Sequence, residues 1–325
     1  MAFERLDTKL RAGKPVSFRF KDCVLYGMLH FPPAGAVRQD TGIIILNPGP
    51  TDRCGPQRLY FKLADRFASE GFPVLRFDAR GVGESEGEWD EKNEGGPITN
   101  IFVEIQRGAW VPDTQAAIEF MMQEAGVQHL ILGGLCGGAL TALLAGADHP
   151  KVTGLLMMGT PITLSSTTAN VQDLPEDVLA RDAGLYFKKL FSPSAWRRLL
   201  TFKTDYKTLW GVLASRIHSR IPPRPSNPYQ AMNPKIDPPF LKAFESAVAA
   251  GKKICFVYSE NDYLWQEFKE YFLPSFENQA SFPFELATIP NSNHNMTEIE
   301  WQDRLNQLLL SWLEKFTTAL SGKKK

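Results

Sequence analysis

The sequence contains few cysteines, no excess of either charge and no long apolar segment free of glycine. The four cysteines lie far apart and form no CxxC pair, so neither a disulfide framework nor a structural zinc site is expected. Lys plus Arg and Asp plus Glu number 36 each, a balance that gives no overall field to attract nucleic acid or an anionic membrane. We therefore expect a globular protein of a reducing compartment, the cytoplasm, with no nucleic-acid partner.

Two segments bear on membrane targeting. Residues 1–14 are polar and mixed in charge, without the apolar core of a secretory signal. Residues 130–147 are uncharged and reach the minimum length of a membrane span. Five glycines interrupt that stretch, however, and its pattern divides into a strand, a turn and a helix. The sequence therefore predicts no transmembrane segment.

Strand-like and helix-like segments alternate along most of the chain. Residues 15–32 show the period-two alternation of an antiparallel pair. Short apolar runs and amphipathic helical patterns then alternate over residues 42–160 and again after residue 252. Such alternation predicts a mostly parallel central sheet flanked by helices, the α/β class.

Residues 161–245 differ from the rest of the chain in their sequence pattern, because they are first helical and then rich in proline. Structureless loops of this length are rare in compact domains, so we expect a lid inserted into a core of residues 1–160 and 246–325. The insertion holds twelve Lys or Arg and seven Asp or Glu, which fits either a solvated face or an anionic substrate. Its aromatic side chains fit either packing on the core or an apolar acyl-chain pocket.

The segment Gly134-Leu135-Cys136-Gly137-Gly138 has the pattern G-x-nucleophile-x-G between a predicted strand and helix. A nucleophile on such a sharp turn adopts strained backbone angles, and only glycine fits two residues before and after it. The N–H of Gly137 is then the expected donor to an oxyanion, and the helix N-terminus favours a thiolate. A structural cysteine in a glycine-rich helix is the alternative.

A catalytic acid and base are expected after the nucleophile, in that chain order. Asp262 follows a predicted strand, and His294 lies in a polar loop between the last strand and the last helix. Glu260, two residues from Asp262, is a rival for the acid. The other histidines fit less well, since they fall in early strands, at helix ends or in the insertion: His30, His129, His149 and His218.

These residues carry a resemblance to α/β-hydrolase-fold enzymes of the serine aminopeptidase and acylglycerol-lipase-like group. The segment "FDARGVGESEGEW" at 77–89 is similar to the D-x-R-G-x-G-x-S motif of that group. More narrowly, the chain resembles bacterial hydrolases associated with exosortase A systems, through "FPVLRFDARGVGESEGE", "LGGLCGGA", "YFKKLFSPSAWRRLL" and "SENDYLWQEF". In the motif, the resemblance implies structural roles for Asp78 and Arg80, which tie loops near the site.

The resemblance also implies the roles of the triad. Cys136 is the expected nucleophile, His294 the general base and acid, and Asp262 the residue that orients the imidazole. The candidate substrate-binding residues are Leu135, Tyr263, Trp196 and Trp210.

A second oxyanion donor is expected from the loop after the third strand, "NPGPTDRCG" at residues 47–55. Here the sequence departs from the usual H-G-x pattern, because Pro48-Gly49 replaces His-Gly and Pro50 follows. Proline has no N–H to donate, so the remaining candidates in this loop are Thr51 and Gly49.

A cysteine nucleophile favours esters, thioesters or lactones, because a thiolate is both a strong nucleophile and a good leaving group. Hydrolysis and acyl transfer through an acyl-cysteine are both compatible with a small-molecule acyl substrate, a carrier-bound thioester included. No cofactor is expected. The alternatives are a binding protein on the same fold that has lost turnover, and a non-hydrolytic lyase. The sequence leaves the oligomeric state open.

Overall fold

The computed structural model describes residues 13–87, 97–163, 233, 235–277 and 281–321. In them an eight-stranded sheet has the order β1-β2-β4-β3-β5-β6-β7-β8. The first two pairings, β1 with β2 and β2 with β4, are antiparallel, and every later pairing is parallel. The strands are β1 (Lys14–Phe20), β2 (Cys23–His30), β3 (Thr41–Leu46), β4 (Val74–Phe77), β5 (His129–Leu135), β6 (Val152–Met158), β7 (Lys253–Ser259) and β8 (Glu285–Ile289).

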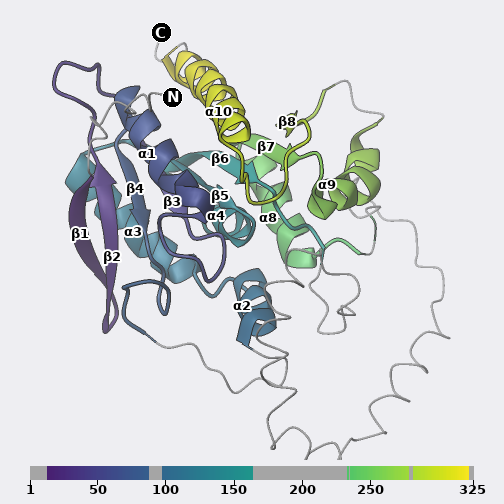
Figure 1. Ribbon diagram of the computed structural model, residues 1–325, viewed down its shortest axis with the longest axis horizontal. Helices are drawn as coiled ribbons and strands as arrows, with labels where there is room; N and C mark the ends of the chain where they lie inside the picture. The colour runs from purple at the N-terminus through teal and green to yellow at the C-terminus, as the bar shows by residue number, and fades with distance from the viewer. Residues whose placement is uncertain (1–12, 88–96, 164–232, 234, 278–280, 322–325) are drawn as a thin grey trace, which may run out of the picture. The chain divides into compact units, whose positions relative to one another are not determined.

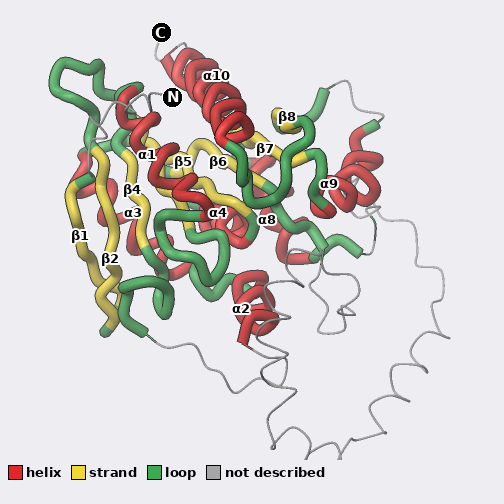
Figure 2. Tube along the Cα trace, viewed as in Figure 1, coloured by secondary structure: helices red, strands yellow, loops and turns green. Residues whose placement is uncertain are grey.

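Helices cover both faces of the sheet (Figures 1 and 2). On one face α1 (Leu59–Ser69) contacts α10 (Ile299–Ser321). On the other, α4 (Gly137–Gly146) lies between α3 (Val111–Ala125) and α8 (Pro238–Ala249). The shorter elements are η1 (Pro56–Arg58), α2 (Pro97–Gln106), α9 (Tyr263–Glu267), η5 (Phe268–Phe272) and η6 (Leu273–Phe276). The predicted α/β architecture with a mostly parallel sheet is confirmed.

Burial explains why β3 ends in the apolar run of residues 43–46. Every residue of β3 and β4 is buried, as expected for strands covered on both faces. Helix α1 buries only one face, through Leu59, Tyr60, Leu63, Ala64, Phe67 and Ala68. All of these side chains except Ala68 share a core cluster with the inner face of α10.

The uncharged stretch at 130–147 divides between two elements, as predicted. Strand β5 ends at Leu135, and α4 begins at Gly137. Within the part of the chain that the structure describes, no helix is both long and apolar enough to cross a membrane.

Most of the predicted insertion, residues 164–232 and 234, lies outside the described residues. Its C-terminal end, from residue 235, is described, and the expected boundary at residue 245 falls inside α8. Phe240 and Phe244 of this helix are fully buried. Residues 238–245 therefore belong to the helical layer over the sheet, because they form the first turns of α8 and its buried side chains hold that helix in place.

A cluster of phenylalanines holds α8 against the segment that follows β7. The ring of Phe244 lies 5.0 Å from that of Phe272 and 6.0 Å from those of Phe276 and Phe284, centroid to centroid. Phe256 of β7 joins the cluster at 5.0 Å from Phe268. The segment that begins at α9 is thus fixed to the sheet by aromatic packing.

We expect Phe244→Ala to lower the free energy of unfolding by about 3–5 kcal/mol, because it removes a fully buried ring and leaves a cavity. Urea unfolding measures the change. Phe282→Ala is the matched control at the rim of the same cluster, where the side chain is 46% exposed, and its cost should be less than half as large. Equal losses in the two variants would contradict a packed core at Phe244.

Candidate active site

Cys136 lies on a strained turn between β5 and α4. It is the N-cap residue of α4, with φ 54° and ψ −119°, angles that non-glycine residues rarely adopt. A Cβ at Gly134 would lie 2.7 Å from the carbonyl carbon of Gly138, and a Cβ at Gly138 would overlap the carbonyl oxygen of Leu46. The turn is therefore tight enough to require both glycines, as the sequence pattern predicted.

The three predicted triad residues come together at the carboxyl ends of three parallel strands. Asp262 caps α9, and its Oδ1 accepts a hydrogen bond of 3.1 Å from the N–H of Leu264. Its other oxygen, Oδ2, lies 2.6 Å from Nδ1 of His294. The side chain of Cys136 also interacts with this imidazole and raises its pKa. The carboxylate is buried, whereas the imidazole is partly exposed.

The surroundings of His294 favour its charged form. Burial alone would lower its pKa, but the interactions with Asp262 and Cys136 raise the pKa to about 10. An imidazole held between a carboxylate and a thiol can thus carry a proton at neutral pH. This arrangement suits an imidazolium that pairs with a thiolate.

Glu260, the rival acid, faces another group. Its Oε2 accepts a hydrogen bond of 2.8 Å from the N–H of Asn291, which has a positive φ of 56°. Glu260 therefore supports the start of the histidine loop and does not contact the imidazole.

His30, another histidine considered as a base, has a structural environment. It is buried and accepts a hydrogen bond of 3.0 Å from Arg76 Nε, and burial and that guanidinium lower its pKa to about 4.

The candidate oxyanion loop, residues 47–55, contacts the turn at Cys136. The N–H of Gly137, the expected oxyanion donor, donates to the carbonyl oxygen of Pro48 at 3.0 Å. Gly49 is buried against Phe102, whereas Thr51 is exposed. In this conformation the donor of Gly137 is therefore occupied by the loop.

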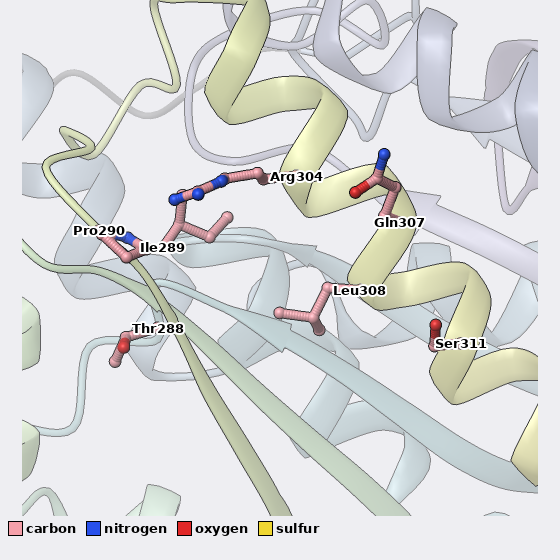
Figure 3. Close-up of a pocket in the computed structure, with 7 residues that line it drawn as sticks. All are labelled: Thr288, Ile289, Pro290, Arg304, Gln307, Leu308 and Ser311. Atoms are coloured by element: carbon pink, nitrogen blue, oxygen red, sulfur yellow. The ribbon is translucent and has the colours of Figure 1, made fainter.

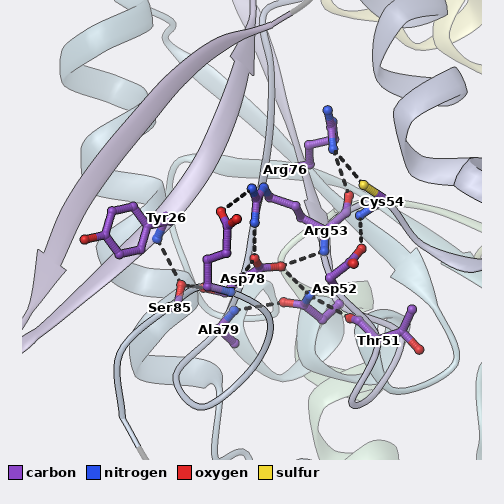
Figure 4. A network of polar contacts seen from close by, with 11 residues as sticks. Tyr26, Thr51, Asp52, Arg53, Cys54, Arg76, Asp78, Ala79 and Ser85 are labelled. Atoms are coloured by element: carbon purple, nitrogen blue, oxygen red, sulfur yellow. Dashed lines mark hydrogen bonds and ion pairs between the residues drawn. The ribbon is translucent and has the colours of Figure 1, made fainter.

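A buried carboxylate anchors this loop (Figure 4). Asp78 Oδ1 accepts from the N–H of Arg53 at 2.6 Å, and Oδ2 pairs with the Arg53 guanidinium. Asn47 donates through Nδ2 to the carbonyl of Thr51 at 3.0 Å, and its Oδ1 accepts from the N–H of Ala79 at 2.9 Å. Both ends of the loop are thereby tied to the segment after β4.

Arg80, the other charged residue of the motif, binds a different carboxylate. Its Nε lies 3.0 Å from each oxygen of the fully buried Asp113 of α3, and its Nη2 donates to the carbonyl of Ala109. Both charged residues of the motif thus act on neighbouring loops and helices, as structural ties.

Two contacts to the site have no signal in the sequence. The hydroxyl of the fully buried Tyr60 accepts a hydrogen bond of 2.7 Å from the N–H of Leu135, the residue directly before Cys136. Gly159, with φ 49°, lies under the imidazole, and a Cβ there would come within 3.3 Å of His294 Cε1. Tyr60 reads as one of several apolar positions of an amphipathic helix, so its role could not be predicted from the sequence.

The candidate substrate-binding residues differ in their surroundings. Leu135 is buried, and Tyr263, the first residue of α9, is 48% exposed. Trp196 and Trp210 lie outside the described residues.

A shallow surface pocket lies between the end of β8 and α10 (Figure 3). It contains none of the triad residues, and Arg304 is the one charged side chain among the seven that line it: Thr288, Ile289, Pro290, Arg304, Gln307, Leu308 and Ser311.

The chain is similar in sequence to a family of known hydrolases. The family model described as serine aminopeptidase, S33 (Hydrolase_4) matches residues 38–187, a little under half of the chain. The matched segment contains Cys136 and ends before Asp262 and His294. No curated protein sequence matches the chain significantly.

Several solved structures resemble the whole chain. An α/β serine hydrolase without a lid from Xanthomonas campestris has 13% identity and a TM-score of 0.51, over 94% of this chain and 95% of that one. Est1E from Butyrivibrio proteoclasticus, with ferulic acid bound, has 14% identity and a TM-score of 0.56, over 92% and 98%. The Pyrococcus furiosus esterase Pf2001 has 18% identity and a TM-score of 0.50, over 93% and 94%. The fold is therefore that of the α/β hydrolases.

We expect Arg53→Met to lower the free energy of unfolding by about 3 kcal/mol, because it leaves the buried carboxylate of Asp78 without its cation. Chemical denaturation measures this loss. Glu84→Gln removes the second, 71% exposed partner of Arg53 and should cost less than about 1 kcal/mol. If Arg53→Met is as mild as Glu84→Gln, Asp78 is not the anchor of the loop.

The raised pKa of His294 predicts a pH-dependent stability. Between the ordinary value of 6.5 and about 10, the folded protein holds a proton on His294 that the unfolded chain releases. The stabilisation from His294 is thus fully present below pH 6.5 and is lost as the pH rises through about 10. Urea unfolding of wild type and His294→Gln across this window should show the wild-type advantage disappearing.

Asp262→Asn is the control for this pH dependence, because it removes the carboxylate that raises the pKa of His294. Its free energy of unfolding should fall less steeply with pH than that of the wild type. Identical pH profiles for wild type and His294→Gln would contradict a proton held on the imidazole.

Proposed function

We propose that this protein is an acyl hydrolase or acyltransferase that acts on an ester, thioester or lactone through an acyl-cysteine. The observation that carries the proposal is the position of Cys136 on a strained turn at a helix N-terminus, beside a His294 that interacts with its side chain and is hydrogen-bonded to Asp262. Nucleophile, base and orienting acid have these mutual contacts in triad enzymes on unrelated folds.

The chemistry follows from the positions of the three side chains. The sulfur of Cys136 attacks the carbonyl carbon of the substrate as a thiolate, and the carbonyl π electrons move to oxygen. The resulting tetrahedral intermediate collapses with loss of the alcohol or thiol, which takes a proton from His294. Water or an acceptor hydroxyl, deprotonated by the same imidazole, then attacks the acyl-cysteine and regenerates the thiol.

Asp262 orients the imidazole throughout this cycle. Its Oδ1 is fixed by the N–H of Leu264, so that Oδ2 faces Nδ1 of His294 and leaves Nε2 for the sulfur. A buried carboxylate that accepts from Nδ1 stabilises the imidazolium formed in each half-reaction. The side chain of Asp262 thereby both caps α9 and orients the imidazole of His294.

The nature of the nucleophile supports activated acyl groups as the substrate class. A thiolate leaves more readily than an alkoxide, so an acyl-cysteine passes its acyl group on easily, and a carrier-bound thioester is a suitable donor. The serine hydrolase and esterase structures support the fold of this chain and do not identify its substrate. The resemblance to exosortase-A-associated hydrolases lies partly in the insertion, and it does not identify a substrate. The cysteine nucleophile is consistent with a reducing compartment.

A second candidate function is a binding protein that kept this fold without turnover. The hydrogen bond from Gly137 N–H to Pro48 O favours it, because the donor needed for an oxyanion is occupied. Such a protein would bind an acyl ligand intact and form no covalent intermediate. Intact-mass measurement separates the two functions.

Incubation with p-nitrophenyl esters and acyl thioesters should add the mass of one acyl group to the protein, and Cys136→Ala should remove this adduct. His294→Gln should slow acylation by about 10²–10⁴-fold, the usual contribution of a general base. Intact-mass spectrometry and the release of p-nitrophenol follow both changes.

Cys23→Ala is the control, since this cysteine lies in the β1–β2 hairpin, away from the triad, and its acylation rate should equal that of the wild type. An acyl adduct that persists in Cys136→Ala would assign the nucleophile elsewhere. If the wild-type protein binds acyl donors and forms no adduct, its function is binding without turnover.

A further inference from the structure

We propose that the peptide bond between Pro48 and Gly49 flips when substrate binds, and that the N–H of Gly49 then becomes the second oxyanion donor. The same flip withdraws the Pro48 carbonyl and releases the N–H of Gly137 as the first donor. This inference rests on the proposed acyl-transfer function and adds a catalytic group to it.

The starting point is the position of one carbonyl oxygen. Pro48 O lies 3.0 Å from the N of Gly137, where the oxygen of a tetrahedral intermediate on Cys136 would have to bind. An oxyanion cannot share this N–H with a carbonyl oxygen, because both are acceptors. A productive site therefore requires the carbonyl of Pro48 to leave.

A peptide flip exchanges the carbonyl for a donor. The C=O of Pro48 and the N–H of Gly49 point in opposite directions across one planar peptide. A half-turn of this plane removes the acceptor and brings a donor to the same side. One rotation thus supplies both donors of the oxyanion hole.

The two residues on either side of this peptide suit the rotation. The ring of Pro48 fixes φ but leaves ψ free, and Pro-Gly pairs occupy the central positions of both turn types that differ by such a flip. Gly49 does not have a positive φ in this structure, and a half-turn moves φ toward the positive region that glycine adopts readily. Another residue at position 49 would resist that movement.

The hydrogen bonds of the loop confine the movement to its middle. Asn47 is held by Ala79 and Thr51, and Arg53 is held by Asp78, so both ends of the loop are fixed. Among the described residues, the N–H of Gly49 has no acceptor. The flip therefore breaks the hydrogen bond from Gly137 to Pro48 and gives both N–H groups the oxyanion as acceptor.

The flip also accounts for Pro50. The usual pattern takes the second donor from a residue after the glycine, where this chain has a proline without an N–H. If Gly49 supplies the donor, position 50 has no catalytic hydrogen bond to make. An exposed proline at position 50 is then compatible with an active enzyme.

Gly49→Ala tests the proposal. The new methyl group would lie 3.2 Å from Phe102 Cζ, and alanine disfavours the positive φ of the flipped state. We expect acylation of Cys136 by a p-nitrophenyl ester to slow by at least about 100-fold, the loss typical of one oxyanion donor. Alkylation of Cys136 by iodoacetamide should not change, because it needs a thiolate but forms no oxyanion.

Pro50→Ala is the matched variant, since it adds an N–H at position 50. The proposal expects its acylation rate to equal that of the wild type, and an acceleration would assign the second donor to position 50 and overturn the flip. A Gly49→Ala protein that acylates as fast as the wild type would overturn it too. Wild-type protein that is alkylated but never acylated contradicts the proposed function itself.

A crystal structure with an aryl trifluoromethyl ketone bound to Cys136 provides a measurement that needs no variant. The oxygen of the adduct should lie about 2.7–3.1 Å from the N atoms of both Gly49 and Gly137. A hydrogen bond from Gly137 to Pro48 that persists beside the adduct would refute the flip.

Discussion

The site depends on the close approach of the end of β3 to the first turn of α4. Gly134 and Gly138 allow the chain to reverse at Cys136, and a side chain at Gly138 would overlap the carbonyl oxygen of Leu46. The same approach brings the next carbonyls of this segment to the helix N-terminus, where Pro48 O meets the N–H of Gly137. The tight turn that holds Cys136 thus also determines what lies against the N–H of Gly137.

Buried carboxylates fix the loops around this turn. Asp262 holds both the first turn of α9 and the imidazole, and Asp78 holds the backbone and guanidinium of Arg53. Each carboxylate is nearly inaccessible to solvent, and each has charged or backbone donors as partners. The loops on either side of Cys136 are therefore each held by a buried acid.

The sequence predicted the fold, the turn at Cys136 and the pairing of His294 with an acid, because chain order and glycine spacing follow from the backbone of this fold. It assigned the acid to Asp262 and left Glu260, two residues away, as a rival, because the cap of α9, which turns Asp262 toward the imidazole, is a feature of the folded backbone. It could not predict the occupied N–H of Gly137, because a backbone hydrogen bond depends on no particular side chain.

In the proposed mechanism, a cysteine nucleophile fits a site whose oxyanion donors are not free before substrate binds. A serine gains nucleophilicity only as its proton leaves in the transition state, which makes it depend on the oxyanion hole from the start. A thiolate paired with a protonated imidazole is already nucleophilic, and the raised pKa of His294 favours that pair. Activation of the sulfur and formation of the oxyanion hole can thus be separate events, the first determined by Asp262 and His294 and the second by the loop at Pro48.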